Sequence, residues 1–193
     1  MTGDTQVSRV EQPGHIRSDH AVTSARPRLP TLKTLGQAAA LAEAGMRPAY
    51  IAQLTGIGIA YAKRAWRDAT RRPCPRGFAL RLDPDTVCGW PVTRKYLYLS
   101  VVIEHMRLEM IEQPAERLIA AWRAVVRRNA GYPHPVDLSI DAAWVLVSAV
   151  ADGYMAIVPC QRCGQPWFSV PHPGPAPLCD PCMSEHKPRI KRI

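Results

Sequence analysis

Apolar residues recur at helical spacing through most of the chain, in blocks that proline and glycine separate. The first block places Leu35, Ala38 and Leu41 on one face, as an amphipathic helix requires. Thr31 or Thr34 can cap its start, because a threonine oxygen accepts from a free backbone N–H of the first turn. The sequence therefore predicts a helix that packs through one apolar stripe.

Two further helices are predicted close behind the first, joined by a tight turn. Pro48 suits the first turn of a helix that runs to Leu54, since its missing N–H is not needed there. The segment 55–58 reads Thr-Gly-Ile-Gly, a turn signal, and a third helix follows over about 59–69. A helix, a tight turn and a helix outline a helix-turn-helix, whose second helix lies in the major groove of DNA. We assign residues 31–72 to this helix-turn-helix-like hairpin.

The middle of the chain carries the longest helical pattern. Proline and glycine interrupt residues 73–90, which we interpret as a linker. A helical body follows over residues 91–153. Its predicted helices run from Tyr96 to Gln113, from Ala115 to Asn129, and from a cap at Ser139 or Asp141 to Gly153.

The two ends of the chain lack this pattern. Residues 1–30 are polar without periodic apolar positions and predict a flexible N-terminal segment. Residues 154–183 are rich in proline and contain two pairs of cysteines, and residues 184–193 form a basic tail. The predicted fold is mainly α: a helical body with an N-terminal helix-turn-helix-like hairpin and a small C-terminal four-cysteine module.

The C-terminal module can build almost no hydrophobic core and needs another source of stability. Cys160 and Cys163 are separated by two residues. Cys179 and Cys182 repeat that spacing after an interval of fifteen residues. Two such turns bring four thiolates into a tetrahedron, the geometry that zinc accepts. We predict one structural zinc ion per chain, held by all four cysteines, with an iron–sulfur cluster or disulfides as the alternatives.

Disulfides are disfavoured because the chain carries no export signal. Its polar first thirty residues lack the apolar stretch of a signal peptide. No uninterrupted apolar run approaches the roughly 18 residues that a membrane-spanning helix needs. We therefore expect a cytoplasmic protein without membrane contact, in which reducing conditions keep paired cysteines available for metal.

The formal net charge of +9 indicates a polyanionic partner, either nucleic acid or an acidic membrane surface, although a merely basic protein has the same charge. Arg123, Arg127 and Arg128 form one basic group, for which a solvated helix face is the default interpretation. The predicted third helix offers another, although a helical hairpin with a solvated basic face has the same pattern. Arginine reads guanine, and both arginine and lysine hold phosphates. The candidate DNA-binding residues are Lys63, Arg64, Arg67, Arg71 and Arg72.

No catalytic arrangement is apparent in the sequence. We find no plausible nucleophile–base pair and no glycine-rich phosphate loop. Four thiolates also leave a bound metal no open position for water or substrate. We therefore predict that the protein is not an enzyme.

The order of these elements resembles the FlhC family, a subunit of the bacterial flagellar master regulator. The most specific stretch, 141–153, contains Trp-Val-Leu-Val-Ser-Ala-Val-Ala-Asp-Gly and is similar to the family's Trp-x-Leu-Val-x-x-Val-x-x-Gly helix before a Cys-x-x-Cys pair. Residues 73–77, Pro-Cys-Pro-Arg-Gly, resemble its proline-rich element. Thr55 and Gly56 fall where the family has a Thr-Gly turn, and the resemblance covers about residues 35–183.

The resemblance implies a mainly helical protein whose four cysteines bind zinc. It also implies assembly with FlhD, typically as four FlhD and two FlhC chains. Such a complex binds double-stranded promoter DNA upstream of flagellar genes and activates transcription with RNA polymerase. The alternative function is a zinc-stabilised protein-interaction module that contacts DNA only through its partner. Candidates for the partner-facing surface, or equally for the chain's own core, are Tyr96, Tyr98, Leu99, Met106 and Met110.

Overall fold

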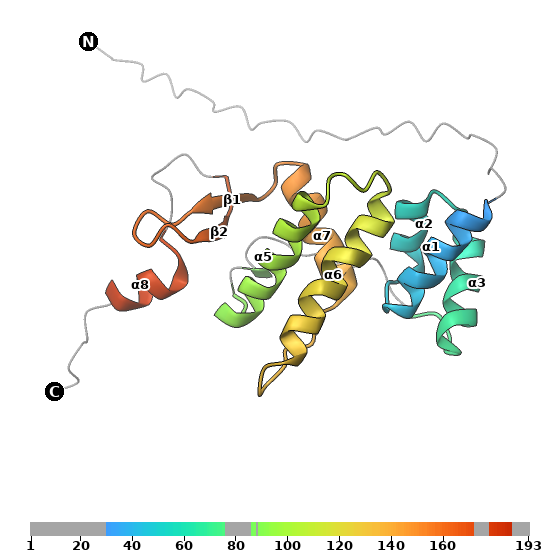
Figure 1. Cartoon of the computed structure of the whole chain (residues 1–193), viewed down its shortest axis with the longest axis horizontal. Helices are drawn as coiled ribbons and strands as arrows, with labels where there is room; N and C mark the ends of the chain where they lie inside the picture. The colour runs from blue at the N-terminus through green and yellow to red at the C-terminus, as the bar shows by residue number, and fades with distance from the viewer. Residues whose placement is uncertain (1–29, 76–85, 88, 172–177, 187–193) are drawn as a thin grey trace, which may run out of the picture.

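The computed structural model describes residues 30–75, 86–87, 89–171 and 178–186, which are mainly helical, as the sequence predicts. Figure 1 shows a three-helix unit at one end, a helical body in the middle and the cysteine-bearing module at the other end. The predicted flexible N-terminal segment, the centre of the predicted linker and most of the basic tail lie outside the described residues.

The N-terminal unit consists of α1 (Leu32–Glu43), α2 (Pro48–Thr55) and α3 (Ile59–Thr70). Of the two predicted caps for the first helix, Thr31 occupies the capping position. Its Oγ1 accepts a hydrogen bond from the backbone N–H of Thr34 at 3.2 Å. The predicted helices of this unit therefore exist with their expected order and nearly their expected limits.

One apolar centre holds the three helices together, because α1 packs against both α2 and α3. Leu41 of α1 and Ile51 of α2 are fully buried there. Ala62 and Trp66 turn the inner face of α3 toward them. The tight connection between α2 and α3 needs Gly56, whose φ of 70° is a left-handed conformation that costs glycine little. The unit is thus a three-helix cluster that contains the predicted hairpin.

The body consists of α5 (Val92–Arg107), α6 (Pro114–Ala130) and α7 (Ile140–Ala151). α5 packs against both of the others, and α6 also contacts α1 and α2. Leu118 and Leu146 are almost completely buried between these helices. Each such side chain contributes about 1.5–3 kcal/mol of transfer free energy.

The predicted helix over 96–113 is wrong at both ends, since the helix runs over 92–107 and starts directly after a proline. Arg117 of α6 binds the connection that follows this helix. Its guanidinium donates to the carbonyl oxygen of Glu109 at 3.1 Å and twice to that of Ile111, at 2.6 and 2.9 Å. These carbonyls are therefore engaged by a side chain rather than by the N–H groups of another helical turn.

Polar side chains fix the connection between α6 and α7. The Asn129 amide donates to the carbonyl of Val136 at 2.7 Å and accepts from its N–H at 3.2 Å, as a neighbouring strand would. The Tyr98 hydroxyl of α5 accepts from the N–H of Ser139 at 2.9 Å. Ser139 in turn caps α7 through the N–H of Ala142, so the first of the two predicted caps is used.

A buried carboxylate joins the N-terminal unit to the body. Asp141, in the first turn of α7, is only 4 % exposed. One oxygen accepts from the backbone N–H of Arg47 at 2.9 Å, and the other lies 3.2 Å from its Nε. Gln37 adds a second link, donating to Glu116 at 2.8 Å. Burial raises the pKa of Asp141, while the hydrogen bond and the charge of Arg47 oppose that rise.

We predict that Arg47→Gln lowers the free energy of unfolding by about 1–3 kcal/mol at neutral pH, because Asp141 loses its cation while it stays buried. The loss of the arginine raises the pKa of Asp141 further. A folded-state pKa above the unfolded value means that this group's contribution is fully present at acid pH and is lost as pH rises through the folded pKa. The deficit should therefore shrink as pH falls from neutral toward the usual carboxyl range.

Arg64→Gln is the matched control, because the Arg64–Asp68 pair has side chains 76 % and 66 % exposed. Exposed ion pairs contribute little, so urea denaturation should find this variant unchanged. Equal losses in the two variants, or a deficit for Arg47→Gln that ignores pH, would contradict the prediction.

Candidate metal centre and nucleic-acid interface

The first cysteine pair lies in the turn of a small hairpin. Strands β1 (Ala156–Pro159) and β2 (Pro166–Ser169) pair antiparallel, with the two prolines opposite each other at the turn. Cys160 donates its N–H to the carbonyl of Gln165 at 2.8 Å and accepts from the N–H of Gly164 at 2.9 Å. Gly164 has a φ of 72°, which lets the chain fold back tightly behind the second cysteine.

The second pair lies at the start of a short helix, α8 (Asp180–His186). Cys179 comes directly before this helix, and Cys182 lies in its first turn. The N–H of Met183 donates to the carbonyl of Cys179 at 2.9 Å, which fixes the direction of both side chains. The N–H of Cys179 also donates to Cys160 Sγ at 3.4 Å, so the helix start and the hairpin turn contact each other directly.

All four thiols converge on one point. Their Sγ atoms lie within 4.8 Å of one another, and those of Cys163 and Cys179 are 3.6 Å apart. That distance is far longer than the roughly 2.05 Å of a disulfide, and all four cysteines are free. A tetrahedral ion with metal–sulfur distances of about 2.3 Å separates its sulfurs by about 3.8 Å. The four cysteines could therefore bind a metal ion after only a small contraction.

The electrostatics of the cluster favour a cation. Hydrogen bonds from the backbone N–H groups of Cys179 and Cys163 lower the pKa of Cys160 to about 6. The thiol of Cys182 behaves oppositely: its hydrogen bond with Cys179 and its burial raise its pKa to about 12. Burial also raises the pKa of Cys179. One thiolate thus forms readily and opposes the ionisation of its neighbours, whereas a divalent cation at the centre stabilises all four thiolates together.

The coordination would be closed. Cys160, Cys179 and Cys182 are buried, and only Cys163 is exposed among the four. Four sulfur ligands fill a tetrahedral shell, so an ion held by all of them has no position left for water or substrate. The arrangement suits an ion that stabilises the module.

The structure places the basic residues of the predicted third helix on its outer face. Lys63, Arg64 and Arg67 are exposed along α3, and Arg71 and Arg72 are exposed just after it. Arg64 makes a 3.6 Å ion pair with Asp68, one turn further along. All five candidate residues are thus gathered at one side and one end of a single helix, where they are accessible to a ligand.

Arg71 closes this helix in an unusual conformation. Its φ is 55°, and among the described residues it is the only non-glycine residue with a positive φ. Its N–H donates to the carbonyl of Arg67 at 2.9 Å, as a left-handed helix cap requires. Glycine fits such a position with less steric cost, so an arginine here is not explained by backbone preference.

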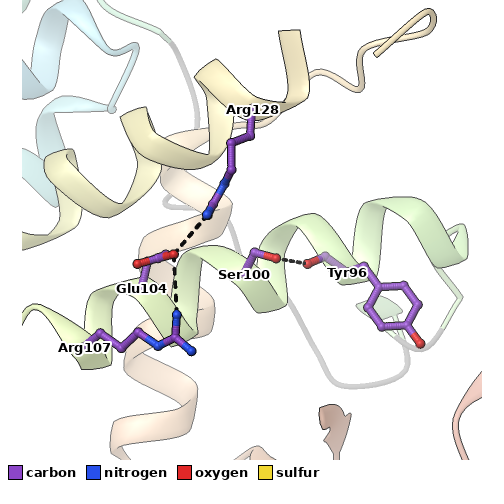
Figure 2. Close-up of polar contacts among 5 residues, drawn as sticks. All are labelled: Tyr96, Ser100, Glu104, Arg107 and Arg128. Atoms are coloured by element: carbon purple, nitrogen blue, oxygen red, sulfur yellow. Dashed lines mark hydrogen bonds and ion pairs between the residues drawn. The ribbon is translucent and has the colours of Figure 1, made fainter. Parts of the chain in front are cut away.

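The second basic group divides into two parts. Figure 2 shows Arg128 reaching from α6 to Glu104 on α5, with Arg107 on the other side of the same carboxylate. Both terminal nitrogens of Arg128 lie 3.1 Å from Glu104 Oε1, so this arginine joins two helices. Arg123 and Arg127 are exposed on α6.

The candidate partner-facing residues also separate. Tyr98 and Leu99 are 2 % exposed and belong to the core. Met106 and Met110 are 54 % and 90 % exposed. The ring of Tyr96 lies against Trp167 in the cysteine module.

No described helix combines the length and the apolar character needed to cross a membrane.

Sequence reasoning missed the supports of the cysteine cluster. It predicted no strands in the module, although Trp167 and Phe168 of β2 are both buried. An apolar pair directly after a Cys-x-x-Cys turn was the available signal. It also missed Lys95, whose Nζ lies 2.5 Å from Asp180 Oδ2. No local pattern reveals that contact, because the two residues are 85 positions apart.

No protein-family model matches the chain, and no curated protein matches it in sequence. The family resemblance therefore rests on the sequence motifs, and the site rests on its own geometry.

We predict that the purified chain carries one tightly bound metal ion and that Cys163→Ser lowers its metal affinity strongly and loosens the module, because one of four ligands is lost. Metal content and amide hydrogen exchange over 156–169 measure the two effects. Cys74→Ser is the matched control, since Cys74 lies outside the cluster. Unchanged metal content and exchange in Cys163→Ser would show that the cluster is not the ligand set.

Proposed function

We propose that this chain is a zinc-stabilised, DNA-binding subunit of a transcription activator that works with FlhD on flagellar genes, as the resemblance to the FlhC family implies. The observation that carries the proposal is the outer face of α3, on which Lys63, Arg64 and Arg67 are exposed while Ala62 and Trp66 are buried on the opposite side.

The local architecture supports insertion of α3 into DNA. A left-handed Gly56 links α2 to α3 in a short turn, as in helix-turn-helix units. α3 has 12 residues and is therefore about 18 Å long, which is enough to lie along a major groove about 12 Å wide. In Figure 1 it lies at the outer edge of the three-helix unit, away from the body. Its arginines suit guanine edges and phosphates.

Zinc is the ion we assign to the cysteine cluster. Four thiolates in a tetrahedral arrangement, contributed by two Cys-x-x-Cys turns, are typical of structural zinc sites. One ion per chain matches the described cluster. Its role is to hold the hairpin and α8 together, and a reducing cytoplasm keeps the thiols free for it.

The limited size of the basic face supports the need for a partner. Two or three arginines on one helix give modest affinity, whereas specific promoter binding draws on larger interfaces. Assembly with FlhD, as four FlhD and two FlhC chains, would repeat the α3 face along double-stranded promoter DNA and present the complex to RNA polymerase. The net charge of +9 favours such a polyanionic target.

We predict that Arg64→Ala with Arg67→Ala weakens binding of the FlhD-containing complex to a flagellar promoter by at least tenfold, since base contacts contribute about 1–3 kcal/mol each. If the two arginines contact phosphates instead, the salt dependence of the binding constant becomes shallower by about two, in log–log slope. Fluorescence anisotropy at several salt concentrations measures both quantities.

Arg107→Ala is the control, because Arg107 is exposed on α5 and does not belong to the α3 face. If the Arg64/Arg67 variant kept the promoter affinity and the salt slope of wild type, α3 would not be the DNA-contacting helix. Binding that persists unchanged, with the partner still assembled, would favour an interaction module that contacts DNA only through its partner.

Arg71→Gly separates folding from binding at the same helix. Glycine accepts the observed φ of 55°, so we expect a melting temperature equal to or slightly above that of wild type. The loss of one cation should make the salt slope shallower by about 0.9. A lowered melting temperature would contradict the strain argument, and an unchanged slope would remove Arg71 from the DNA-binding set.

A further inference from the structure

A buried lysine lies where the cysteine module meets the body. Lys95 of α5 is 5 % exposed, and its Nζ lies 2.5 Å from Asp180 Oδ2. Asp180 directly follows Cys179 and lies between the two cysteines of the second pair, Cys179 and Cys182. The lysine therefore binds the side chain of a residue that lies, in sequence, between two of the four candidate ligands.

An aromatic ring of the cysteine module lies against the same lysine. Its Nζ lies 5.2 Å from the ring centre of Trp167, which comes from β2 of the cysteine module. The neighbouring Tyr96 packs edge-on against that ring at 5.5 Å. Lys95 and Tyr96, which are successive residues of α5, therefore both contact the Trp167 ring of the module.

The charge of the cluster explains why a cation is kept at this place. Burying an ammonium group costs several kcal/mol, and attraction to a single, partly exposed carboxylate offsets only part of that cost. Four thiolates around a divalent ion carry a net charge of about −2. Asp180 adds another negative charge next to them, with 27 % of its side chain exposed. Arg162 supplies a cation from the other side, its Nη1 lying 3.5 Å from the carbonyl of Cys182.

We propose that Lys95 is the counter-cation of the metal centre: it stabilises the metal–thiolate cluster and, through Asp180 and Trp167, attaches the cysteine module to α5. Metal binding and docking of the module on the body are then coupled, so each strengthens the other. The inference rests on the metal site of the proposed function and is independent of DNA binding.

The role of the Lys95 charge is tested by the Zn²⁺ affinity of the 193-residue chain, measured by competition with a chromophoric chelator. Lys95→Met should lower this affinity about 10–100-fold, the range for groups that support metal ligands. Lys95→Arg keeps the charge and should restore most of it. Lys33→Met removes the same charge from an exposed ion pair, whose lysine side chain is 63 % exposed, and should leave the affinity unchanged.

Asp180→Asn separates a counter-cation from an ordinary structural ion pair. It breaks the same pair as Lys95→Met but removes a negative charge and keeps the lysine cation near the cluster, so Zn²⁺ affinity should fall much less than in Lys95→Met. An equal loss of affinity in the two variants would mean that the pair only bridges two surfaces, and would overturn the proposal. If Lys95→Met does not fold, the double variant Lys95→Met with Asp180→Asn takes its place, because it leaves no unpaired charge. The Zn²⁺ affinity of the double variant should be lower than that of Asp180→Asn alone. Equal affinities of these two variants would overturn the proposal.

Amide hydrogen exchange over 156–169 tests the coupling to docking. In wild type, removal of Zn²⁺ should speed exchange in this hairpin, and in Lys95→Met the metal-loaded hairpin should exchange faster than the wild-type one. Exchange rates that Lys95→Met leaves unchanged would contradict the attachment. A wild-type chain that takes up no Zn²⁺ would overturn the metal site and this inference together, whereas failure to bind DNA would affect neither.

Discussion

The convergence of four cysteine sulfur atoms on one point is the constraint that shapes the C-terminal module. The hairpin has strands of four residues, and α8 has seven, so neither can supply much stability alone. The backbone nevertheless directs all four Sγ atoms to within 4.8 Å of one another, where they can ionise together only around a cation. An ion bound by the four cysteines would contribute folding free energy in place of the missing core.

Buried ion pairs join the three parts of the molecule, and the two pairs share one design. Asp141 lies in the first turn of α7 and receives Arg47 from the N-terminal unit. Asp180 lies in the first turn of α8 and receives Lys95 from the body. A carboxylate at the start of a helix is stabilised by the helix dipole, which helps to offset the cost of burying it. Both pairs fix orientation, because each connects helices of different units.

This construction separates the two proposed roles in space. The cysteine module and α3 lie at opposite ends of the molecule in Figure 1, with the body between them. The apolar face of α3 is used up by packing on α1 and α2, so its basic face stays accessible. Under the proposed function, the metal-stabilised module presents a surface to a protein partner, while α3 at the other end contacts nucleic acid.

The sequence by itself determined the local features: helices with apolar stripes, the Gly56 turn, the grouping of cysteines by Cys-x-x-Cys spacing, and pairs of candidate caps from which the structure uses Thr31 and Ser139. Each depends on residues within a few positions of one another, where propensity and spacing act directly. The tertiary structure decided the path of the chain after the first body helix, since Arg117 of the next helix binds the carbonyls of Glu109 and Ile111 in that connection. It also decided which cation is buried beside the cysteines, because Lys95 meets Asp180 across 85 positions that no local pattern connects.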